Sequence, residues 1–472
     1  MNRVLVLCLA LFAAGVAEAR PLFVDSFDPP RIDAQFPRVG GIYQLPAGPA
    51  TNRLQWLLTK LVPGATISDA EITANFDTAW LTTNSIAQTR TFIESVRTSY
   101  PNAIVTDVIA VTPVRLTLLI DTPGSPAPSG FLQFGARYTG AQRIVQFGVS
   151  TYGGSVMYPA DRTLTMAQAA DKFATLSTMP SLLVGRIGAN GQCTTITARN
   201  GTTPRATASI FKTWVLAALG RAIRDGAVAS ADPLPLVASE IAQGGVINSE
   251  PLGTLFPVRD LAVLMMGISD NTATDLLHQL LGRETIAPIV QATVAAPNLL
   301  LPFLGISEQF HVFRSFPLTE AQSYVNGDQA FKNQFLQERI VPLGPNNGGA
   351  YFHTGLLTSG TWRASPVDIC QAFAWLRRLP QGSEAIQTID AAFGAGVAQP
   401  DVRARWDRVW YKGGSLASGA GFHVLTHAWM LENAGEDPYV VVAMSNSDAG
   451  NIDQFNVQSV TGRLLELVSQ LP

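Results

Sequence analysis

Lysine is scarce in this chain of 472 residues, which has five lysines against 27 arginines. Charged residues of all kinds make up only 14%, the net charge is −3, and no basic run occurs. Proteins that bind nucleic acid neutralise phosphates with clustered Lys and Arg, so we expect no nucleic-acid partner. Because 47% of the residues are hydrophobic, the chain can bury a large core, and its length predicts two domains.

Residues that bind metals are also few, with three cysteines and five histidines. Neither Cys193 nor Cys370 has a His or another Cys at ligand spacing. His423 and His427 are four residues apart, but the apolar segment around them predicts a strand, on which this spacing does not converge on one ion. We therefore expect no metal and no cofactor. Cys193 and Cys370 either form one disulfide in an oxidising compartment or stay as two buried thiols.

Long apolar runs are absent after the N-terminus. Arg3 supplies a positive charge, the stretch from Val4 to Val16 is apolar, and Ala17-Glu18-Ala19 resembles a cleavage site. The apolar stretch is shorter than the roughly 20 residues that span a membrane. The sequence predicts a signal peptide at 1–19 and a secreted or periplasmic product with no membrane anchor.

The first part of the remaining chain, up to about residue 155, predicts a small α+β domain. Residues 20–50 contain several prolines and little periodicity, which predicts an extended lead-in. Helical apolar spacing then continues to Tyr100. Four β-rich runs follow, near 103–111, 115–122, 131–138 and 144–152. We expect 51–155 to fold as helices packed on one face of a short antiparallel sheet.

The pattern changes near residue 160. A strand pair near Leu182 to Ala198 is followed by a long series of helical segments. Three closing strands are expected near Val409 to Tyr411, Phe422 to Glu432 and Tyr439 to Asn446, before a helix from about Asn456 to Gln470. Strands at both ends with helices between them predict one sheet built from the two ends of 160–472.

Ser209 precedes the apolar, helix-forming stretch from Ile210 to Leu219, which places it at a helix N-terminus. One turn later, Lys212 lies on the same face and can approach the Ser209 hydroxyl. A neutral lysine there would be the base for a nucleophilic serine, and the helix N-terminus would stabilise an oxyanion. A helix cap with a surface lysine is the alternative. Arginine cannot lose its proton, so a lysine in an arginine-rich chain favours the catalytic interpretation.

The tripeptide Ser269-Asp270-Asn271 stands between two apolar helical segments. Asp and Asn suit a tight turn between helices, so a capping role alone stays open. In a catalytic site, Ser269 would relay a proton to the leaving group, and Asn271 would hold a substrate amide or the lysine.

The run Lys412-Gly413-Gly414-Ser415 follows the strand-like segment from Trp406 to Tyr411. Two glycines let a substrate lie against the edge of the strand. The backbone N–H of Ser415 would join that of Ser209 in an oxyanion hole, and Lys412 would attract a substrate carboxylate. An ordinary glycine turn with a surface lysine is the alternative. Against it, two of the five lysines of the chain fall in these short motifs.

The three motifs in this order resemble the penicillin-recognising serine enzymes, the class A β-lactamases and penicillin-binding proteins. The 60-residue spacing from Ser209 to Ser269 is similar to that of class A, and the resemblance covers about 160–472. It implies a β-lactamase/transpeptidase-like fold, an antiparallel sheet with helices on both sides. It also implies catalytic roles for Ser209, Lys212 and Ser269, and substrate binding by Asn271, Lys412, Gly413, Gly414 and Ser415.

One part of the class A pattern is missing. Class A enzymes carry a Glu-x-x-x-Asn loop whose glutamate activates the deacylating water, and here that region, 297–359, is longer than in a compact class A enzyme. Neither Glu308 nor Glu320 has an Asn four residues later. Glu250 is followed by a proline as in that loop, but it precedes Ser269.

This region and the N-terminal α+β domain together resemble a subgroup typified by the β-lactamase-related proteins of clavulanic acid biosynthesis clusters. The N-terminal domain of that subgroup is similar to the steroid isomerase and nuclear transport factor 2 (NTF2) fold. The subgroup keeps the three motifs without the class A glutamate. The resemblance therefore implies an acylatable Ser209 more than fast antibiotic turnover.

The sequence thus predicts an exported serine hydrolase that forms an acyl-enzyme on Ser209 with a β-lactam or ester carbonyl. Two alternatives stay open. One is a D-alanyl-D-alanine peptidase of the penicillin-binding type, and the other is a ligand-binding protein that has lost turnover. In each case we expect the partner to be a small or peptidoglycan-like molecule.

Overall fold

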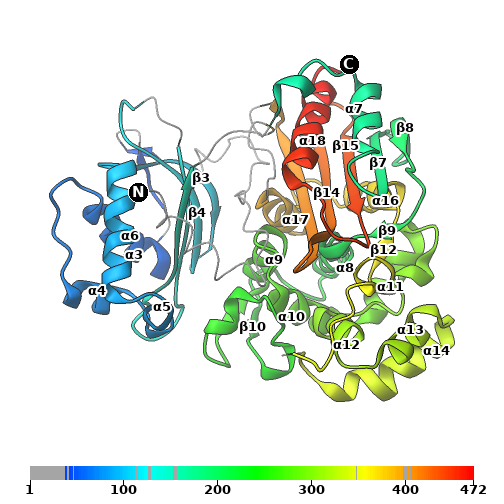
Figure 1. Cartoon of the computed structure of the whole chain (residues 1–472), viewed down its shortest axis with the longest axis horizontal. Helices are drawn as coiled ribbons and strands as arrows, with labels where there is room; N and C mark the ends of the chain where they lie inside the picture. Colours follow the sequence, from blue (N-terminus) through cyan, green and yellow to red (C-terminus); the bar gives the residue numbers. More distant parts are fainter. Residues whose placement is uncertain are drawn as a thin grey trace. The chain divides into compact units, whose positions relative to one another are not determined.

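The computed structural model describes residues 38–472 except 40–41, 46, 113, 126–128, 152–156, 347, 397–401 and 403–404. The chain divides into two compact units (Figure 1). The N-terminal unit contains the described residues of Pro21–Gly154 together with Ser249–Thr254, and the C-terminal unit contains those of Ser155–Asn248 and Leu255–Pro472. The predicted signal peptide and most of the predicted lead-in lie outside the described residues.

The N-terminal unit is an antiparallel sheet with helices packed against it. Its strands run in the order β3-β4-β5-β6, so that each pairs with its neighbour in the sequence. They are β3 (Ile104–Val111), β4 (Arg115–Asp121), β5 (Gly130–Ala136) and β6 (Ile144–Thr151). The helices are α3 (Pro49–Lys60), α4 (Asp69–Asn75), α5 (Thr78–Thr83) and α6 (Ile86–Ser99), and the short hairpin of β1 (Arg38–Val39) and β2 (Ile42–Tyr43) precedes them. The predicted α+β pattern is confirmed.

Aromatic side chains fill the core of this unit. Phe76 and Phe134 are fully buried, and the Phe76 ring lies 5.6 Å from that of Trp80 and 6.5 Å from that of Phe147. Tilted aromatic pairs at such distances add stability beyond the area they bury. The similarity of this unit to the steroid isomerase and NTF2 fold stays a prediction.

Glu250 belongs to this N-terminal unit, although the sequence analysis placed it in the second domain. Its carboxylate accepts a hydrogen bond from the backbone N–H of Tyr138 at 3.1 Å, and its side chain is buried. A buried carboxylate needs such a donor. Glu250-Pro251 therefore matches the class A loop only in its residue types, because it belongs to the other compact unit.

The C-terminal unit is built on a five-stranded antiparallel sheet in the order β13-β14-β15-β7-β8. The strands are β7 (Met179–Ile187), β8 (Cys193–Arg199), β13 (Arg408–Ser418), β14 (Gly421–Glu432) and β15 (Tyr439–Asn446). Strand β15 pairs with β7, with Val441 opposite Val184, so the two ends of the unit share one sheet as predicted. Strand β13 continues through Lys412-Gly413-Gly414-Ser415, each paired with β14, so the alternative of an ordinary glycine turn is wrong.

Helices cover both faces of this sheet (Figure 1). On one face lie α7 (Met166–Phe173) and α18 (Gln454–Val468), packed on strand residues such as Trp429 and Val441. On the other face lie α16 (Pro366–Leu376) and α17 (Glu384–Gly394), with α8 (Lys212–Arg224) behind them. The prediction of an antiparallel sheet with helices on both sides is confirmed.

The remaining helices stand between the two halves of the sheet in the sequence. The first three are α9 (Val258–Gly267), α10 (Asn271–Leu281) and α11 (Arg283–Thr293). The long region 297–359 then forms α12 (Ile306–Arg314), α13 (Leu318–Asn326), α14 (Gln329–Phe335) and α15 (Leu356–Ser359). Phe313, Tyr324 and Phe335 form part of its own hydrophobic core. Two short pairs complete the unit, β9 (Arg205–Ala206) with β12 (Arg363–Ala364) and β10 (Pro233–Pro235) with β11 (Leu255–Pro257).

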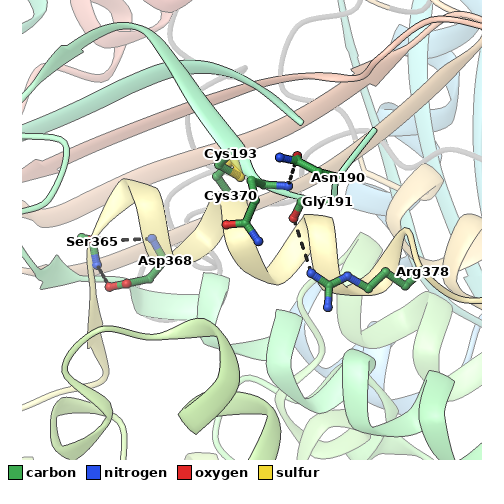
Figure 2. Close-up of a disulfide and its surroundings, with 8 residues drawn as sticks. Asn190, Gly191, Cys193, Ser365, Asp368, Cys370 and Arg378 are labelled. Atoms are coloured by element: carbon green, nitrogen blue, oxygen red, sulfur yellow. Dashed lines mark hydrogen bonds between the residues drawn. A yellow bond between two sulfur atoms is a disulfide. The ribbon is translucent and has the colours of Figure 1, made fainter. Parts of the chain in front are cut away.

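A disulfide joins Cys193 to Cys370, which decides between the two alternatives for these cysteines (Figure 2). It connects the first residue of strand β8 to helix α16, 177 residues apart in the sequence. Helix α16 begins at Pro366. Its N-cap residue Ser365 and Asp368 in its first turn exchange capping hydrogen bonds at 3.2 and 2.8 Å. No helix within the described residues is long and apolar enough to cross a bilayer.

Candidate active site

Ser209 lies in a single 3-10 turn, Ala208–Phe211, directly before α8 begins at Lys212. Its neighbours Ala208, Ile210 and Phe211 are buried, whereas Ser209 itself is only half-buried. Ala208 has a φ of +43°, a left-handed conformation that costs about 1–3 kcal/mol for a residue with a side chain. The turn is strained, and it presents Ser209 at the start of the helix.

Trp362 packs against this turn and is hydrogen-bonded to the residue before it. Its ring stacks on that of Phe211, with 3.8 Å between centroids and 2° between planes. Its backbone carbonyl accepts a hydrogen bond from the N–H of Thr207 at 2.9 Å. These contacts join segments more than 150 residues apart and support the strained backbone beside Ser209.

Lys212 is fully buried, so the alternative of a surface lysine is wrong. Its Nζ lies 2.7 Å from the carbonyl oxygen of Ser269 and 2.8 Å from Asn271 Oδ1. The same Nζ lies 3.1 Å from Ser269 Oγ. A buried amine with these polar neighbours is held in one place by the second motif.

In the second motif, Asp270 caps a helix, whereas Ser269 and Asn271 contact Lys212. Asp270 is the N-cap of α10 and accepts hydrogen bonds from the N–H groups of Ala273, Val246 and Ile247 at 2.8, 2.7 and 3.1 Å. Burial raises the pKa of the Asp270 carboxyl, and the three N–H donors oppose that shift. Ser269 has a φ of +60°, so it too is held in a left-handed conformation.

Lys412, on β13, approaches the same serine from the sheet. Its side chain is 2% exposed, and its Nζ lies 3.1 Å from Ser269 Oγ and 2.7 Å from the Gly413 carbonyl oxygen. The hydroxyl of Ser269 therefore lies between the amines of Lys212 and Lys412. Three segments that are far apart in the sequence meet at this one oxygen.

Gly414 lies against the backbone of Ser209. A Cβ at position 414 would lie 2.6 Å from the Ser209 nitrogen, 2.7 Å from the Thr207 oxygen and 2.9 Å from Thr426 Oγ1. No such contact is tolerated, so only glycine lets strand β13 approach the serine this closely. Ser415 follows on the same strand, opposite Leu425.

Thr426 is a site residue that the sequence analysis missed. Its hydroxyl is buried on β14 and lies 2.9 Å from the Thr207 carbonyl oxygen and 3.1 Å from that of Gly414. It thereby ties the turn before Ser209 to the glycine strand. A single threonine in a buried strand carries no signal that distinguishes it from a packing residue.

The carboxylates considered for deacylation are engaged elsewhere. Glu308 pairs with Arg283, with N–O distances of 2.7 and 3.2 Å, and accepts from the Gly305 N–H at 2.8 Å. Burial acts to raise the pKa of Glu308, but Arg283, the charge of His278 and the Gly305 N–H together outweigh it, so the pKa is lowered. Glu320 pairs with Arg339. The hydrogen bonds of Glu308 thus lead to Arg283 and Gly305, away from Lys212 and Ser269.

The described part of the chain contains no cluster of three or more His, Cys, Asp or Glu side chains that could hold a metal ion. Both His423 and His427 lie on β14, as the strand prediction required. His423 is hydrogen-bonded to Ser418 Oγ at 2.8 Å, and His427 to Tyr411 Oη at 2.8 Å.

Comparison with known families finds a match over part of this unit. Residues 189–300 match the model of the β-lactamase enzyme family. The matched residues include Ser209, Lys212, Ser269 and Asn271, but not the glycine strand. No curated protein matches the chain.

Several solved structures are similar to the chain at low identity. A β-lactamase from Chitinophaga pinensis is 12% identical over 64% of this chain and 97% of its own, with a TM-score of 0.43. A β-lactamase from Sphaerobacter thermophilus is 18% identical over 65% and 97%, with a TM-score of 0.43. A β-lactamase from Xanthomonas campestris is 16% identical over 65% and 98%, with a TM-score of 0.42.

Proposed function

We propose that this protein is an exported serine hydrolase that forms an acyl-enzyme on Ser209 with a β-lactam or ester carbonyl. One observation carries the proposal, namely that Ser269 Oγ lies 3.1 Å from both Lys212 Nζ and Lys412 Nζ. A hydroxyl between two amines is a proton relay when one amine is neutral and the other is charged. The family match over 189–300, which includes Ser209 and Lys212, supports the same class of chemistry.

Lys212 must be neutral to act as the base, and burial favours the neutral form of an amine. Its Nζ donates to the Ser269 carbonyl at 2.7 Å and to Asn271 Oδ1 at 2.8 Å, and these two acceptors hold the amine beside Ser269 Oγ at 3.1 Å. A neutral amine keeps both of these donors and has a lone pair that can accept a hydroxyl proton. Lys412 donates to the Gly413 carbonyl at 2.7 Å, which leaves further donors of its ammonium group for Ser269 Oγ and a substrate carboxylate.

In the acylation step, Ser209 Oγ bonds to the carbonyl carbon while its proton moves to Lys212 Nζ. The C–N bond of a lactam, or the C–O bond of an ester, then breaks. The leaving atom takes the proton of Ser269, which Lys212 replaces. The N–H groups of Ser209 and Ser415 would stabilise the oxyanion. Gly414 lets strand β13 approach the Ser209 turn closely enough for this.

Deacylation is the slow step in this proposal. A water molecule must be deprotonated to attack the ester on Ser209, and Glu308 is held by Arg283. Lys212, neutral again after the leaving group departs, is the base that remains, and it begins the helix that follows the Ser209 turn. A long-lived acyl-enzyme is also the behaviour of a penicillin-binding D-alanyl-D-alanine peptidase, which is the second candidate function.

Export is supported by the disulfide as well as by the predicted signal peptide. The Cys193–Cys370 bond joins residues 177 apart. Disulfides of this structural kind persist in secreted and periplasmic proteins and are rare in the cytosol.

The experiment uses nitrocefin and a p-nitrophenyl ester as substrates, with mass spectrometry of the intact protein after incubation with penicillin G. Wild type is expected to gain one penicillin mass on the peptide that contains Ser209, and Ser209→Ala is expected to gain none. Ser323→Ala is the matched control, because Ser323 is an exposed serine whose hydroxyl bonds only the Thr319 carbonyl in its own helix.

The lifetime of the adduct separates the candidate functions. Rapid loss with steady nitrocefin turnover supports a hydrolase, whereas a stable adduct with release of D-alanine from an acyl-D-Ala-D-Ala peptide supports the peptidase. Absence of both turnover and adduct in the wild-type protein would refute acyl transfer and leave a binding protein.

A further inference from the structure

A cavity lies in the C-terminal unit, and none of the candidate active-site residues lines it. Its volume is about 150 Å³, and its walls come from residues 298–302, from helices α13 and α14 and from the segment 359–363. Leu299, Leu301 and Leu304 give it an apolar side. An apolar cavity of about this volume is large enough to hold a benzene ring.

Two cationic side chains line the same cavity, Lys332 from α14 and Arg363 from β12. Among the described residues, no carboxylate acts on the pKa of either one, which burial lowers in both and the charge of Arg363 lowers further in Lys332. Arg363 Nε is buried and has no hydrogen-bond partner, and Lys332 Nζ reaches only the Asn298 carbonyl, at 3.5 Å. Both side chains are half-buried, but the Arg363 Nε atom itself is buried, and a buried donor without an acceptor is costly, so its presence needs an explanation.

Further positive charge lies beside these two residues. Arg205 stands on β9, which pairs with β12, and its Nε donates to a neutral partner, Ser181 Oγ, at 3.2 Å. Burial lowers the pKa of Arg205, and the charge of Arg363 lowers it further. Burial and Arg363 act in the same way on Lys332. The cations therefore repel one another where a carboxylate would be expected to separate them.

The polar wall has one more unsatisfied group. Thr361 Oγ1 is buried in the cavity lining and has no hydrogen-bond partner. Arg363 Nε and Thr361 Oγ1 are thus two buried polar atoms on one short segment, each able to donate to an acceptor that the protein does not supply.

We propose that this cavity is a binding site for a small organic acid with an apolar body. The carboxylate lies between Arg363 and Lys332 and accepts from Thr361, and the apolar body lies against the leucine side of the cavity. Arg is well suited to hold a carboxylate through two parallel hydrogen bonds. An apolar wall opposite a cationic one selects a ligand that has both characters.

The cavity contains none of the acyl-transfer residues, but it shares Trp362 with the contacts that hold the Ser209 turn. Trp362 lines the cavity, and the same residue stacks on Phe211 and holds Thr207. The ligand touches none of the residues assigned to the chemistry of Ser209. The proposal therefore stands or falls independently of the hydrolase function.

The test is isothermal titration of the full protein with benzoate and with benzamide, its neutral isostere. Wild type is expected to bind benzoate at least about tenfold more tightly than benzamide, the effect of one charge-assisted interaction. Arg363→Gln is expected to weaken benzoate binding by at least about tenfold and to leave benzamide binding unchanged. Arg162→Gln is the matched control, because Arg162 is exposed and its loss changes the net charge equally.

A second variant keeps the test decisive if Arg363→Gln does not fold. Lys332→Gln, on the rim of the same cavity, is expected to weaken benzoate binding in the same direction. Equal benzoate binding in Arg363→Gln, Lys332→Gln and Arg162→Gln would overturn the proposal. Benzamide binding as tight as that of benzoate, displacement of benzoate by inorganic phosphate at equal concentration, or no benzoate binding at millimolar concentration would also overturn it.

Discussion

Two regions of the C-terminal unit bring positive charges close together, and they differ in what surrounds those charges. At the candidate active site, Lys212 and Lys412 are surrounded by acceptors, and both reach the hydroxyl of Ser269. In the cavity beside α14, Arg363 has a buried Nε with no partner. The amines of the first region have acceptors within the protein and are preorganised for chemistry, whereas Arg363 Nε has no acceptor within the protein and lines a cavity that we propose binds an anion.

The largest expected effect sharpens the difference between the two site lysines. Lys212→Arg keeps the positive charge but removes the ability to lose a proton, so acylation of Ser209 is expected to fall by about 10²–10⁴-fold. Lys412→Arg also keeps the charge, and its proposed role needs only charge, so the expected loss is about tenfold or less. Stopped-flow acylation by nitrocefin measures both rates. Equal losses in the two variants would contradict the assignment of Lys212 as the base.

The second prediction concerns Asp275, whose carboxylate connects α10 to the start of α12. It accepts from the N–H groups of Ile306 and Ser307 at 2.6 and 2.9 Å. Burial raises its pKa to about 7, with the charges of Glu308 and Glu240 adding to the shift and the two N–H donors opposing it. The folded state therefore holds this proton at pH values where the unfolded chain has lost it.

The sign follows from that pKa. A carboxyl with a raised pKa in the folded protein stabilises the fold fully below its unfolded pKa near 4, and this contribution is lost as the pH rises to about 7. The free energy of unfolding of wild type minus that of Asp275→Asn is expected to fall by a few kcal/mol over this range. Asp328→Asn is the control, because Asp328 also accepts an N–H from the first turn of a helix, its own helix α14, but is exposed. A constant difference for Asp275→Asn between pH 4 and 8 in urea titrations would refute the prediction.

The two regions also differ in what the sequence could predict about them. Ser209 with Lys212 and Ser269 with Asn271 lie in short motifs whose spacing fixes their geometry, so local pattern was enough to propose them. Arg363 and Lys332 become neighbours only through the fold of 297–359, and neither has a local pattern. The same holds for the stack of Trp362 on Phe211 and for the Cys193–Cys370 pair. Their separation along the chain does not predict whether they are in contact.

The strands illustrate the same limit at the level of the fold. Apolar runs predicted β7, β14 and β15 to within a few residues, because each is a continuous buried segment. The prediction for the first closing strand ended at Tyr411, but β13 continues to Ser418. Glycine has a low strand propensity, and here the pairing of Gly413 with His427 and of Gly414 with Thr426 overrides it.

The smallest expected effect tests why glycine is needed at that point. Gly414→Ala would place a methyl group 2.6 Å from the Ser209 nitrogen, and the backbone of either strand β13 or the Ser209 turn must move. Overpacking of this kind costs about 1–3 kcal/mol of the free energy of unfolding. Gly419→Ala is the matched control, since a Cβ there meets no atom within 4 Å, and a change of no more than about 0.5 kcal/mol is expected.

Acylation separates this packing effect from simple loss of stability. Because the displaced atoms include the backbone nitrogen proposed for the oxyanion hole, Gly414→Ala is expected to slow acylation of Ser209 even at temperatures where the variant is fully folded. Gly419→Ala is expected to keep the wild-type rate. If Gly414→Ala lost stability but acylated at the wild-type rate, the close approach of β13 would be a packing feature, and the oxyanion hole would have to be formed by other groups.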